Sequence, residues 1–515
     1  MSKPIHVRLT ASLSERLTNS LRFLCCLLFQ SAAFLFCSVA LAADKPNVIL
    51  ILADDLGYGD LGCYGQQRIK TPRLDRMAKE GLRFTDFYAG CTVCAPSRCV
   101  LMTGYHMGHA YVRGNAGRTN PAIQILRDRD VTVAEVLKQT GYATALCGKW
   151  GLGEEGSIGT PNKQGFDYFF GYLNQFHAHN YYPAYLLKNE SRFPMKNVVP
   201  GEGEFGSGVA SQRIEYSADL ITAEALAWIE QNKDQPFFLY YAPTIPHANN
   251  EGRSEGMEVP DLGEYAKTDW PPNQKAHAAM ISRLDADVGR LLDLLKKLNL
   301  DEKTLVLFSS DNGPHREGGN DPDFNNSNGP LQGIKRDLTD GGIRVPFLAR
   351  WPGKIAPGTS GFVGGFQDLL PTLAELAGAT AGVPRDTDGL SIVPTLLGQA
   401  AQQKQHGYLY WLFYERGAGQ AARMGNWKAV QQPYHTPVRL YNLEQDIGEE
   451  RDVAAEQPAV VARLKAAMQA AYTPHENWQL PDAAEGAKAA GKAKATGKAK
   501  SQPQKEARQP TNKNK

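Results

Sequence analysis

An apolar run without polar alternation constrains the fold of this 515-residue chain more than any other feature. Residues 47–53 read Asn-Val-Ile-Leu-Ile-Leu-Ala, and the run ends abruptly at Asp54-Asp55. Such a run is typical of a strand buried on both faces of a parallel sheet. Residues 131–153, 219–250 and 280–315 each repeat the order helix, apolar strand, polar loop. This alternation predicts an α/β fold with a large, mostly parallel sheet sandwiched by helices.

Polar side chains follow all four apolar strands at the point where each strand ends. They are Asp54 and Asp55 after the first strand, then Lys149, then His247, and finally Asp311 with Asn312. In open parallel sheets, ligands bind outside the carboxyl ends of the strands. The sequence therefore predicts one shared site at this edge of the sheet.

The texture of the sequence changes after about residue 400. Three segments, 406–417, 426–432 and 438–454, are typical of short antiparallel strands, and a helical pattern follows at 454–472. We expect a catalytic α/β domain over residues 46–400. A smaller C-terminal α+β subdomain with an antiparallel sheet is expected over residues 401–478.

Both ends of the chain have the composition of segments outside the folded protein. Basic residues precede an apolar run that ends in Ala40-Leu41-Ala42, which predicts a signal peptide over residues 1–42 and export to the periplasm or the medium. An N-terminal membrane anchor is the alternative. No later run is long and apolar, so we expect no transmembrane segment in the mature protein. Residues 483–515 predict a disordered Lys-rich tail, with no specific nucleic-acid partner.

The strand-end residues have the chemistry of a site for a divalent cation. Asp54, Asp55, Asp311 and Asn312 offer oxygen ligands, which favour Ca²⁺ or Mg²⁺ over Zn²⁺. Each pair taken alone also suits a turn or a helix cap. A cation beside the basic side chains Arg98, Lys149, Lys335 and His247 would suit an oxyanion of sulfur or phosphorus.

The segment 91–99, Cys-Thr-Val-Cys-Ala-Pro-Ser-Arg-Cys, raises a question about its cysteines. Pro96 fits the first turn of a helix whose free N–H groups would face an anion, and Cys94 stands at its entrance. A thiolate there is reactive, so Cys94 is predicted to be a nucleophile or the precursor of one. A zinc site lacks further ligands. Disulfides among Cys63, Cys91, Cys99 and Cys147 stay open, because five cysteines remain after the signal and one must be unpaired.

These residues carry a resemblance to a known family. The run Cys94 to Arg98, followed by Thr103-Gly104, resembles the C-x-P-S-R-x₄-T-G signature of type I sulfatases, in the alkaline phosphatase superfamily. Further motifs resemble the family in order from about Pro46 to about Trp478. The resemblance implies that a formylglycine-generating or other sulfatase-maturating enzyme oxidises Cys94 to Cα-formylglycine. One hydroxyl of the hydrated aldehyde would attack sulfur, and the other would later expel sulfate.

The resemblance also implies a role for each candidate site residue. Asp54, Asp55, Asp311, Asn312 and modified Cys94 would hold Ca²⁺, with Mg²⁺ as the alternative ion. Arg98 would steady the diol, and Lys149 and Lys335 would bind sulfate oxygens. His247 or Lys335 would protonate the leaving oxygen, since a leaving alkoxide needs a proton.

One position departs from the family pattern. Gly151 stands where many family members have a histidine that contacts the diol. We expect a replacement from among His106, His109, His177 and His179. We favour the last two as substrate-contacting residues, because they lie in residues 165–183, which we expect to be a loop that covers the site.

The leading hypothesis is therefore a sulfuric ester hydrolase that cleaves sulfate monoesters. Its expected partner is a sulfated small molecule or glycan, with a sulfated carbohydrate favoured over an aryl sulfate. The alternatives are a phosphodiesterase or phosphonate monoester hydrolase on the same fold, or a catalytically silent protein that binds sulfated glycans.

Overall fold

The computed structural model describes residues 45–118, 120–201 and 203–481. The predicted signal peptide and the predicted tail from residue 483 lie outside the described residues. Within the described ranges, no helix combines the length and the apolarity that a membrane span requires.

The core of the molecule is a ten-stranded mixed sheet. In spatial order its strands are β11 (Gly358–Ser360), β2 (Leu82–Phe84), β10 (Phe347–Arg350), β9 (Thr304–Ser310), β1 (Asn47–Ala53), β8 (Phe237–Ala242), β4 (Ala143–Lys149), β5 (Tyr168–Tyr172), β6 (Tyr185–Lys188) and β7 (Ser191–Pro194). The five strands from β9 to β5 pair in parallel, whereas β10, β6 and β7 run antiparallel to their neighbours. The prediction of a large, mostly parallel sheet is confirmed.

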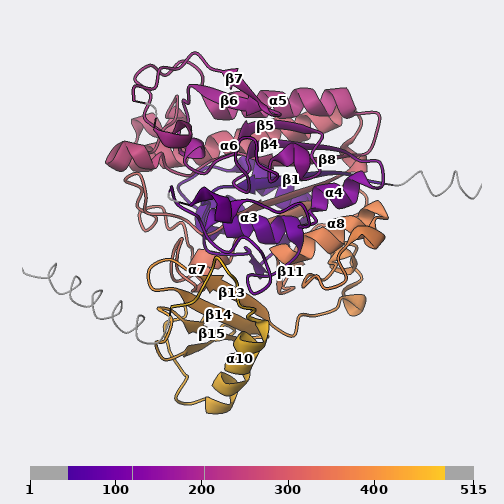
Figure 1. Cartoon of the computed structure of the whole chain (residues 1–515), viewed down its shortest axis with the longest axis vertical. Helices are drawn as coiled ribbons and strands as arrows, with labels where there is room; N and C mark the ends of the chain where they lie inside the picture. Colours follow the sequence, from indigo (N-terminus) through magenta and orange to yellow (C-terminus); the bar gives the residue numbers. More distant parts are fainter. Residues whose placement is uncertain (1–44, 119, 202, 482–515) are drawn as a thin grey trace, which may run out of the picture. The chain divides into compact units, whose positions relative to one another are not determined.

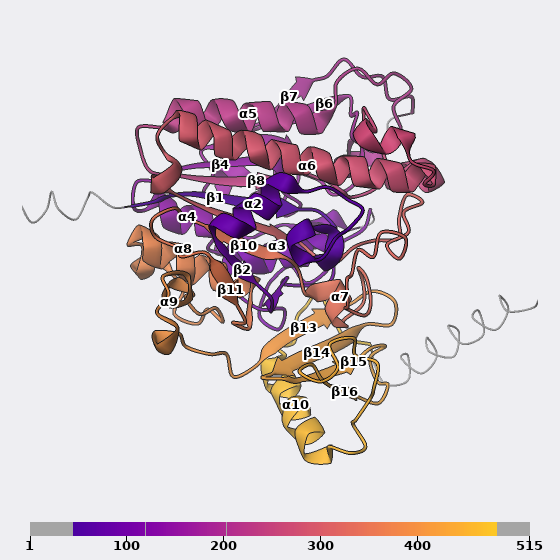
Figure 2. The ribbon, with the colours of Figure 1, turned by 180° about the vertical axis from the view of Figure 1, so that it is seen from behind.

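Helices cover both faces of this sheet (Figures 1 and 2). One face packs against α3 (Cys94–Thr103), α4 (Val133–Lys138) and α8 (Leu369–Ala377), and the other against α2 (Pro72–Glu80), α5 (Ser217–Asn232) and α6 (Pro272–Lys297). Val48, Leu50 and Leu52 of β1 belong to the first core, and Ile49 and Ile51 belong to the second. All seven residues of β1 are buried, which explains why the run contains no polar alternation.

Backbone pairing continues past the ends of the central strands. The amide of Asp54 donates to the carbonyl of Ile245 at 3.0 Å, and the amide of Asp311 donates to the carbonyl of Ala53 at 3.1 Å. These bonds hold the loops after β8, β1 and β9 side by side. The strand-end residues of the sequence are thereby brought to one edge of the sheet.

The C-terminal part forms a separate antiparallel sheet. Its strands are β13 (Leu409–Phe413), β14 (Gly419–Met424), β15 (Trp427–Gln431) and β16 (Arg439–Asn442), paired in that order, and α10 (Pro458–Ala471) packs against β14 and β15. The smaller elements are β3 (Phe87–Tyr88), β12 (Gly364–Gly365), α7 (Asp340–Ile343) and α9 (Val393–Leu396). The prediction of a smaller α+β part with an antiparallel sheet is confirmed, although β14 was not among the strands expected.

The expectation for residues 165–183 is wrong in part. Tyr168–Tyr172 form the strand β5, which pairs in parallel with β4, and only the residues after it form a loop. Phe169 and Phe170 point to opposite faces of the sheet and are both buried. An aromatic run of this kind packs on a sheet as well as it covers a site, so its composition did not distinguish the two.

Candidate active site

Helix α3 brings Cys94 to the carboxyl edge of the sheet. Cys94 is the first residue of the helix, and Pro96 lies in the first turn, where its missing N–H costs no helical hydrogen bond. All ten residues of α3 are buried. The amide of Ala95 donates to Asn115 Oδ1 at 3.2 Å, so a neighbouring loop already engages one free N–H at this end of the helix.

The Cys94 side chain lies directly against the acidic cluster. Its Sγ is 3.4 Å from Asp54 Oδ1, and the residue is only 3% exposed. Burial raises the pKa of the thiol well above its ordinary value; Asp54 and Asp311 raise it further, and Lys149 opposes them. The unmodified side chain is therefore a thiol and not the reactive thiolate that its helix position alone would predict.

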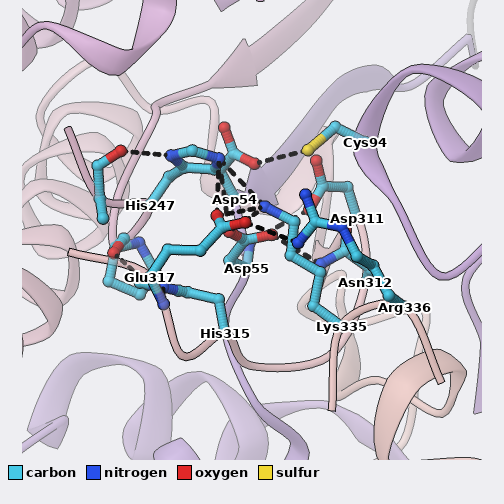
Figure 3. A network of polar contacts seen from close by, with 12 residues as sticks. Asp54, Asp55, Cys94, His247, Asp311, Asn312, His315, Glu317, Lys335 and Arg336 are labelled. Atoms are coloured by element: carbon cyan, nitrogen blue, oxygen red, sulfur yellow. Dashed lines mark hydrogen bonds and ion pairs between the residues drawn. The ribbon is translucent and has the colours of Figure 1, made fainter. Parts of the chain in front are cut away.

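Three buried carboxylates at the strand ends are each paired with a buried cation, and Figure 3 shows one of these pairs, Asp55 with Lys335. The pairs are Asp54 with Lys149 at 2.7 Å, Asp55 with Lys335 at 2.8 Å, and Asp311 with Arg98 at 2.9 Å. Burial alone would raise the pKa of Asp54, but Lys149, His247 and Arg98 hold it below its ordinary value. Burial and the charge of Asp54 raise the pKa of Asp311 to about 7. The three carboxylates thus repel one another in a site that lacks solvent screening.

The donor set at this position fits a hard divalent cation. Asn312 donates from Nδ2 to Asp55 Oδ1 at 2.6 Å, while its Oδ1 is buried without a hydrogen-bond partner in the described part of the chain. Side-chain ligand atoms of Asp54, Asp55 and Cys94 lie within 4.8 Å of one another. Asp55 also has a left-handed backbone with φ of 66°, which turns its carboxylate toward the cluster. Clustered carboxylates plus an unpaired amide oxygen match the ligands of Ca²⁺ or Mg²⁺.

Lys335 and His247 form the next layer of the site. His247 Nδ1 lies 2.7 Å from the carbonyl of Ala248, to which it donates, so Nε2 accepts from Lys335 Nζ at 3.1 Å. Burial and the charge of Lys335 lower the pKa of His247 to about 3. Burial would lower the pKa of Lys335, yet Asp55 and Glu317 raise it well above its ordinary value. The lysine is therefore the protonated partner and the histidine is neutral.

Glu317 is a site residue that the sequence did not indicate. Its Oε2 lies 2.9 Å from Lys335 Nζ, and its Oε1 lies 2.5 Å from Arg336 Nη1. Figure 3 shows this carboxylate beside His247 as well, at 3.8 Å. Glu317 follows the Asp-Asn-Gly turn by only four residues, but no spacing rule singles out a lone glutamate in such a loop.

The structure separates the four histidines that were candidates to replace a side chain at Gly151. His179 stacks on His247 with 5.0 Å between ring centroids and contacts Glu251 at 3.1 Å. His177 binds the carbonyl of Tyr185 instead. The other two, His106 and His109, follow the far end of α3 and are paired with Asp388. A ten-residue helix is about 15 Å long, so His106 and His109 lie far from Cys94. Of the four, His179 is the one that contacts a site residue, His247, in the described part of the chain.

The five described cysteines are all free thiols. Cys91 and Cys99 are buried on either side of Cys94 in sequence, and Cys147 lies inside β4. No disulfide therefore forms among the positions that the sequence left open, in the described part of the chain.

Comparison with known proteins agrees with this geometry. The sulfatase family model matches residues 46–379, and a model described as N-sulphoglucosamine sulphohydrolase, C-terminal, matches residues 334–473. Human arylsulfatase A is 34% identical over 479 residues, covering 82% of this chain and 87% of that protein. Human N-acetylgalactosamine-6-sulfatase is 33% identical over 401 residues, covering 75% and 72%.

A solved structure shows the same relationship in three dimensions. The crystal structure of Ps i-CgsB in complex with k-i-k-neocarrahexaose superposes with a TM-score of 0.71 and 28% sequence identity, covering 87% of this chain and 98% of that one. The family match spans the strand-end carboxylates, Cys94, the paired lysines and His247. The chain therefore belongs to the sulfatase family and is a sulfuric ester hydrolase with an alkaline phosphatase-like fold.

Proposed function

We propose that this protein removes sulfate from sulfated carbohydrates through a nucleophile made from Cys94. One observation carries this proposal: in the buried cluster, Cys94 Sγ lies 3.4 Å from Asp54 Oδ1. The residue stands where an attacking group would meet both the oxygen ligands and the paired lysines. Its high thiol pKa supports a precursor role, which a maturating enzyme would complete by converting Cys94 to formylglycine.

Each implied group would supply one kind of chemistry. Hydrated formylglycine supplies a hydroxyl nucleophile, and a Ca²⁺ ion held by Asp54, Asp55, Asp311 and Asn312 supplies positive charge that polarises a bound sulfate oxygen. The chain already balances these carboxylates with Arg98, Lys149 and Lys335. A divalent cation would therefore leave the site with net positive charge, which suits a sulfate ester.

The paired lysines have distinct tasks in this proposal. Lys149 is fully buried at the end of β4 and bonds Asp54, so it would bind a sulfate oxygen from a fixed position. Lys335 carries the proton that His247 Nε2 accepts in the structure, so Lys335 is the better donor to the leaving alcohol oxygen. His247 would orient that proton through its bond to the Ala248 carbonyl.

The names of related proteins support a carbohydrate substrate. Human N-acetylgalactosamine-6-sulfatase is named for a sulfated sugar, and the Ps i-CgsB crystal holds a neocarrahexaose. In this chain, His179 lies beside His247, and Arg118 contacts both Glu251 and the ring of Phe176. A rim of rings and charged groups suits the hydroxyls and faces of a sugar.

Peptide mass spectrometry of the protein from its native host tests the nucleophile. The peptide with Cys94 should be lighter by about 18 Da than the cysteine form, the change expected for thiol-to-aldehyde oxidation. The same preparation should release sulfate from sulfated sugars when Ca²⁺ is present. An unmodified thiol in active enzyme would contradict the proposal, and hydrolysis of phosphonate monoesters alone would favour that alternative activity.

The same sample tests our proposals for the chain ends. We propose that residues 1–42 are removed on export, that 46–400 and 401–478 act as the two domains, and that 483–515 form a tail. N-terminal sequencing of the native protein should begin just after Ala42. A start at Met1 would favour the membrane anchor instead.

A further inference from the structure

Gly151 follows Lys149, a residue of the proposed sulfate site, by two positions. The side chain between them, Trp150, points into the core, where its Nε1 donates to the carbonyl of Gly159 at 2.7 Å. Lys149 Nζ in turn bonds Asp54 at 2.7 Å. Gly151 has a φ of 80°, a left-handed conformation that favours glycine.

Pairing beyond the strand ends brings the loop after β5 against Gly151. Trp150 and Gly151 donate backbone hydrogen bonds to Tyr172 and Leu173, each at 2.9 Å. A Cβ atom on Gly151 would lie 2.8 Å from Gln175 Nε2 and 3.2 Å from its Cδ. The Gln175 amide therefore occupies the space in which any side chain at position 151 would begin.

Gln175 differs from the adjacent Asn174 because its amide nitrogen has no hydrogen-bond partner in the described part of the chain. The residue is 9% exposed, and no atom of the described chain accepts a hydrogen bond from its Nε2. Asn174, by contrast, donates from its Nδ2 to Glu154, and its Oδ1 accepts from the amide of Phe176. A buried N–H donor without an acceptor is destabilising, and such groups in folded proteins commonly serve a ligand.

Along the sequence, this donor lies between two points at which the loop contacts other segments near the site. The loop leaves the sheet beside Gly151, two residues after Lys149, and reaches His179, which stacks on His247. Gln175 lies between these two points. Its Nε2 lies against position 151, two residues from Lys149, and has no hydrogen-bond acceptor in the described part of the chain.

We propose that Gln175 is a substrate-binding residue whose Nε2 donates a hydrogen bond to an oxygen of the bound sulfate group. This inference rests on the proposed function, since it takes the anion beside Lys149 to be a sulfate ester. A neutral amide neither gains nor loses a proton near neutral pH. The donor at this position thus contributes equally across the working pH range, which a histidine at position 151 would not do.

The first test compares Gln175→Ala and Gln175→Glu with the wild type. We expect kcat/KM for a sulfate ester to fall by about 100-fold for Gln175→Ala, the scale of one lost donor to a developing oxyanion. Gln175→Glu should lose more, because its carboxylate repels sulfate. Melting temperatures should stay near that of the wild type. Gln420→Glu in β14, remote from the site, is the matched amide-to-acid control and should keep wild-type kcat/KM.

Titration with inorganic sulfate separates this inference from the proposed function. Gln175→Glu should weaken sulfate binding by at least about tenfold, whether or not the preparation is catalytically mature. Wild-type kcat/KM and wild-type sulfate affinity in both Gln175 variants would overturn the inference and leave the sulfatase proposal standing. A wild-type enzyme that binds sulfate through Gln175 but hydrolyses no sulfate ester would instead overturn the proposed function.

A double-mutant cycle tests the shared space directly. In Gly151→Ala the new Cβ would press on Gln175 Nε2, so kcat/KM should fall. In the Gln175→Ala background, the same change should cost much less, because no amide remains to be displaced. Additive losses would show that the two positions act independently and would contradict the proposal.

Discussion

At the scale of single residues, the site is defined by which buried polar atoms already have partners. The carboxylates of Asp54, Asp55 and Asp311 each bond a cation of the chain. The Oδ1 of Asn312 bonds nothing in the described residues, although the residue is fully buried. An unpaired oxygen among paired carboxylates indicates a metal ligand, because a cation satisfies it at no cost to the existing pairs.

Asn312→Ala should therefore reduce the stabilisation that Ca²⁺ provides. Ligand binding stabilises the folded state by about 2.7 kcal/mol when free Ca²⁺ is 100 times its Kd, and a tenfold loss of affinity removes about 1.4 kcal/mol of that. Thermal melts with Ca²⁺ and with a chelator measure the difference. Asn426→Ala, in the turn between β14 and β15, is the control. Equal Ca²⁺-dependent shifts in wild type and Asn312→Ala would contradict this assignment.

Lys335→Met should reveal whether Lys335 donates a proton. We expect kcat/KM to fall by about 1,000-fold for a sulfated sugar, whose alkoxide leaves only with a proton. An aryl sulfate with an acidic phenol needs no such proton and should lose much less. Lys354→Met, at an exposed position, should leave both rates unchanged. Equal losses on both substrates would assign Lys335 to sulfate binding alone.

Asp60 gives the folded protein a pH-dependent element outside the metal cluster. Burial raises the pKa of Asp60 to about 7, against a hydrogen bond from the Gly57 amide that lowers it. Because the pKa is higher in the folded state, Asp60 contributes its full stabilisation of the folded protein at pH values below the unfolded-state pKa of 3.8. This contribution is lost as the pH rises toward 7. The full effect is on the order of 4 kcal/mol.

Asp60→Asn should remove the loss of folding stability that the wild type shows as the pH rises toward 7. The amide stays neutral at every pH and keeps an oxygen for the Gly57 amide, which donates to Asp60 at 2.8 Å. We expect the variant to melt above the wild type at pH 8 and near it at pH 4. Melting curves across this range are the measurement. A constant difference at all pH values would show that packing, not ionisation, distinguishes the two proteins.

At the scale of elements, the apolar strands were the predictable part of the fold. An unbroken run such as that in β1 is buried on both faces, and its abrupt polar end marks the edge where ligands gather. For this reason the sequence alone groups Asp54, Lys149, His247 and Asp311 at one site. Contacts made by loops could not be grouped, because neither Glu317 nor Gln175 follows a period or a spacing rule.

Strand β4 depends on glycine for its place in the sheet, which gives an element-scale prediction. A Cβ on Gly148 would lie 2.0 Å from the carbonyl oxygen of Ala242 in β8, and Gly148 has a φ of 127°. Gly148→Ala should therefore destabilise the protein by about 3 kcal/mol and displace Lys149, with loss of activity.

Gly141→Ala is the matched control for that change. Gly141 also has a left-handed backbone, with φ of 86°, but no atom lies within 4 Å of the position that a Cβ would take. This variant should cost about 1 kcal/mol of backbone strain and leave kcat unchanged. Thermal melts and kcat, measured for both variants, compare their losses of stability and of activity. If the two substitutions cost the same, close approach between β4 and β8 is not what requires Gly148.

At the scale of the whole molecule, the C-terminal sheet contacts the segments that carry Cys94 and Lys335. Trp411 in β13 donates to the carbonyl of Ala89, ahead of Cys94, at 2.9 Å. Glu415, after β13, pairs with Arg336 at 3.0 Å, next to Lys335. The small sheet thus holds the two segments that carry the proposed nucleophile and the proposed proton donor. Its role is to fix their position, since none of these contacts reaches the carboxylate cluster itself.

A buried charge network between the two sheets gives the last prediction. Lys428 in β15 is fully buried, 2.6 Å from Asp340 Oδ1 in α7 and 3.0 Å from Glu449 Oε1. Lys428→Met would leave both carboxylates without that cation, and breaking a buried pair in this way costs about 3–5 kcal/mol. Lys465→Met on the exposed face of α10 should cost almost nothing. Melting temperature and kcat/KM, measured well below the transition, are compared for both variants. We expect Lys428→Met to lose stability first and activity second, because α7 begins five residues after Lys335. Unchanged stability would mean that the C-terminal sheet contributes nothing through this network.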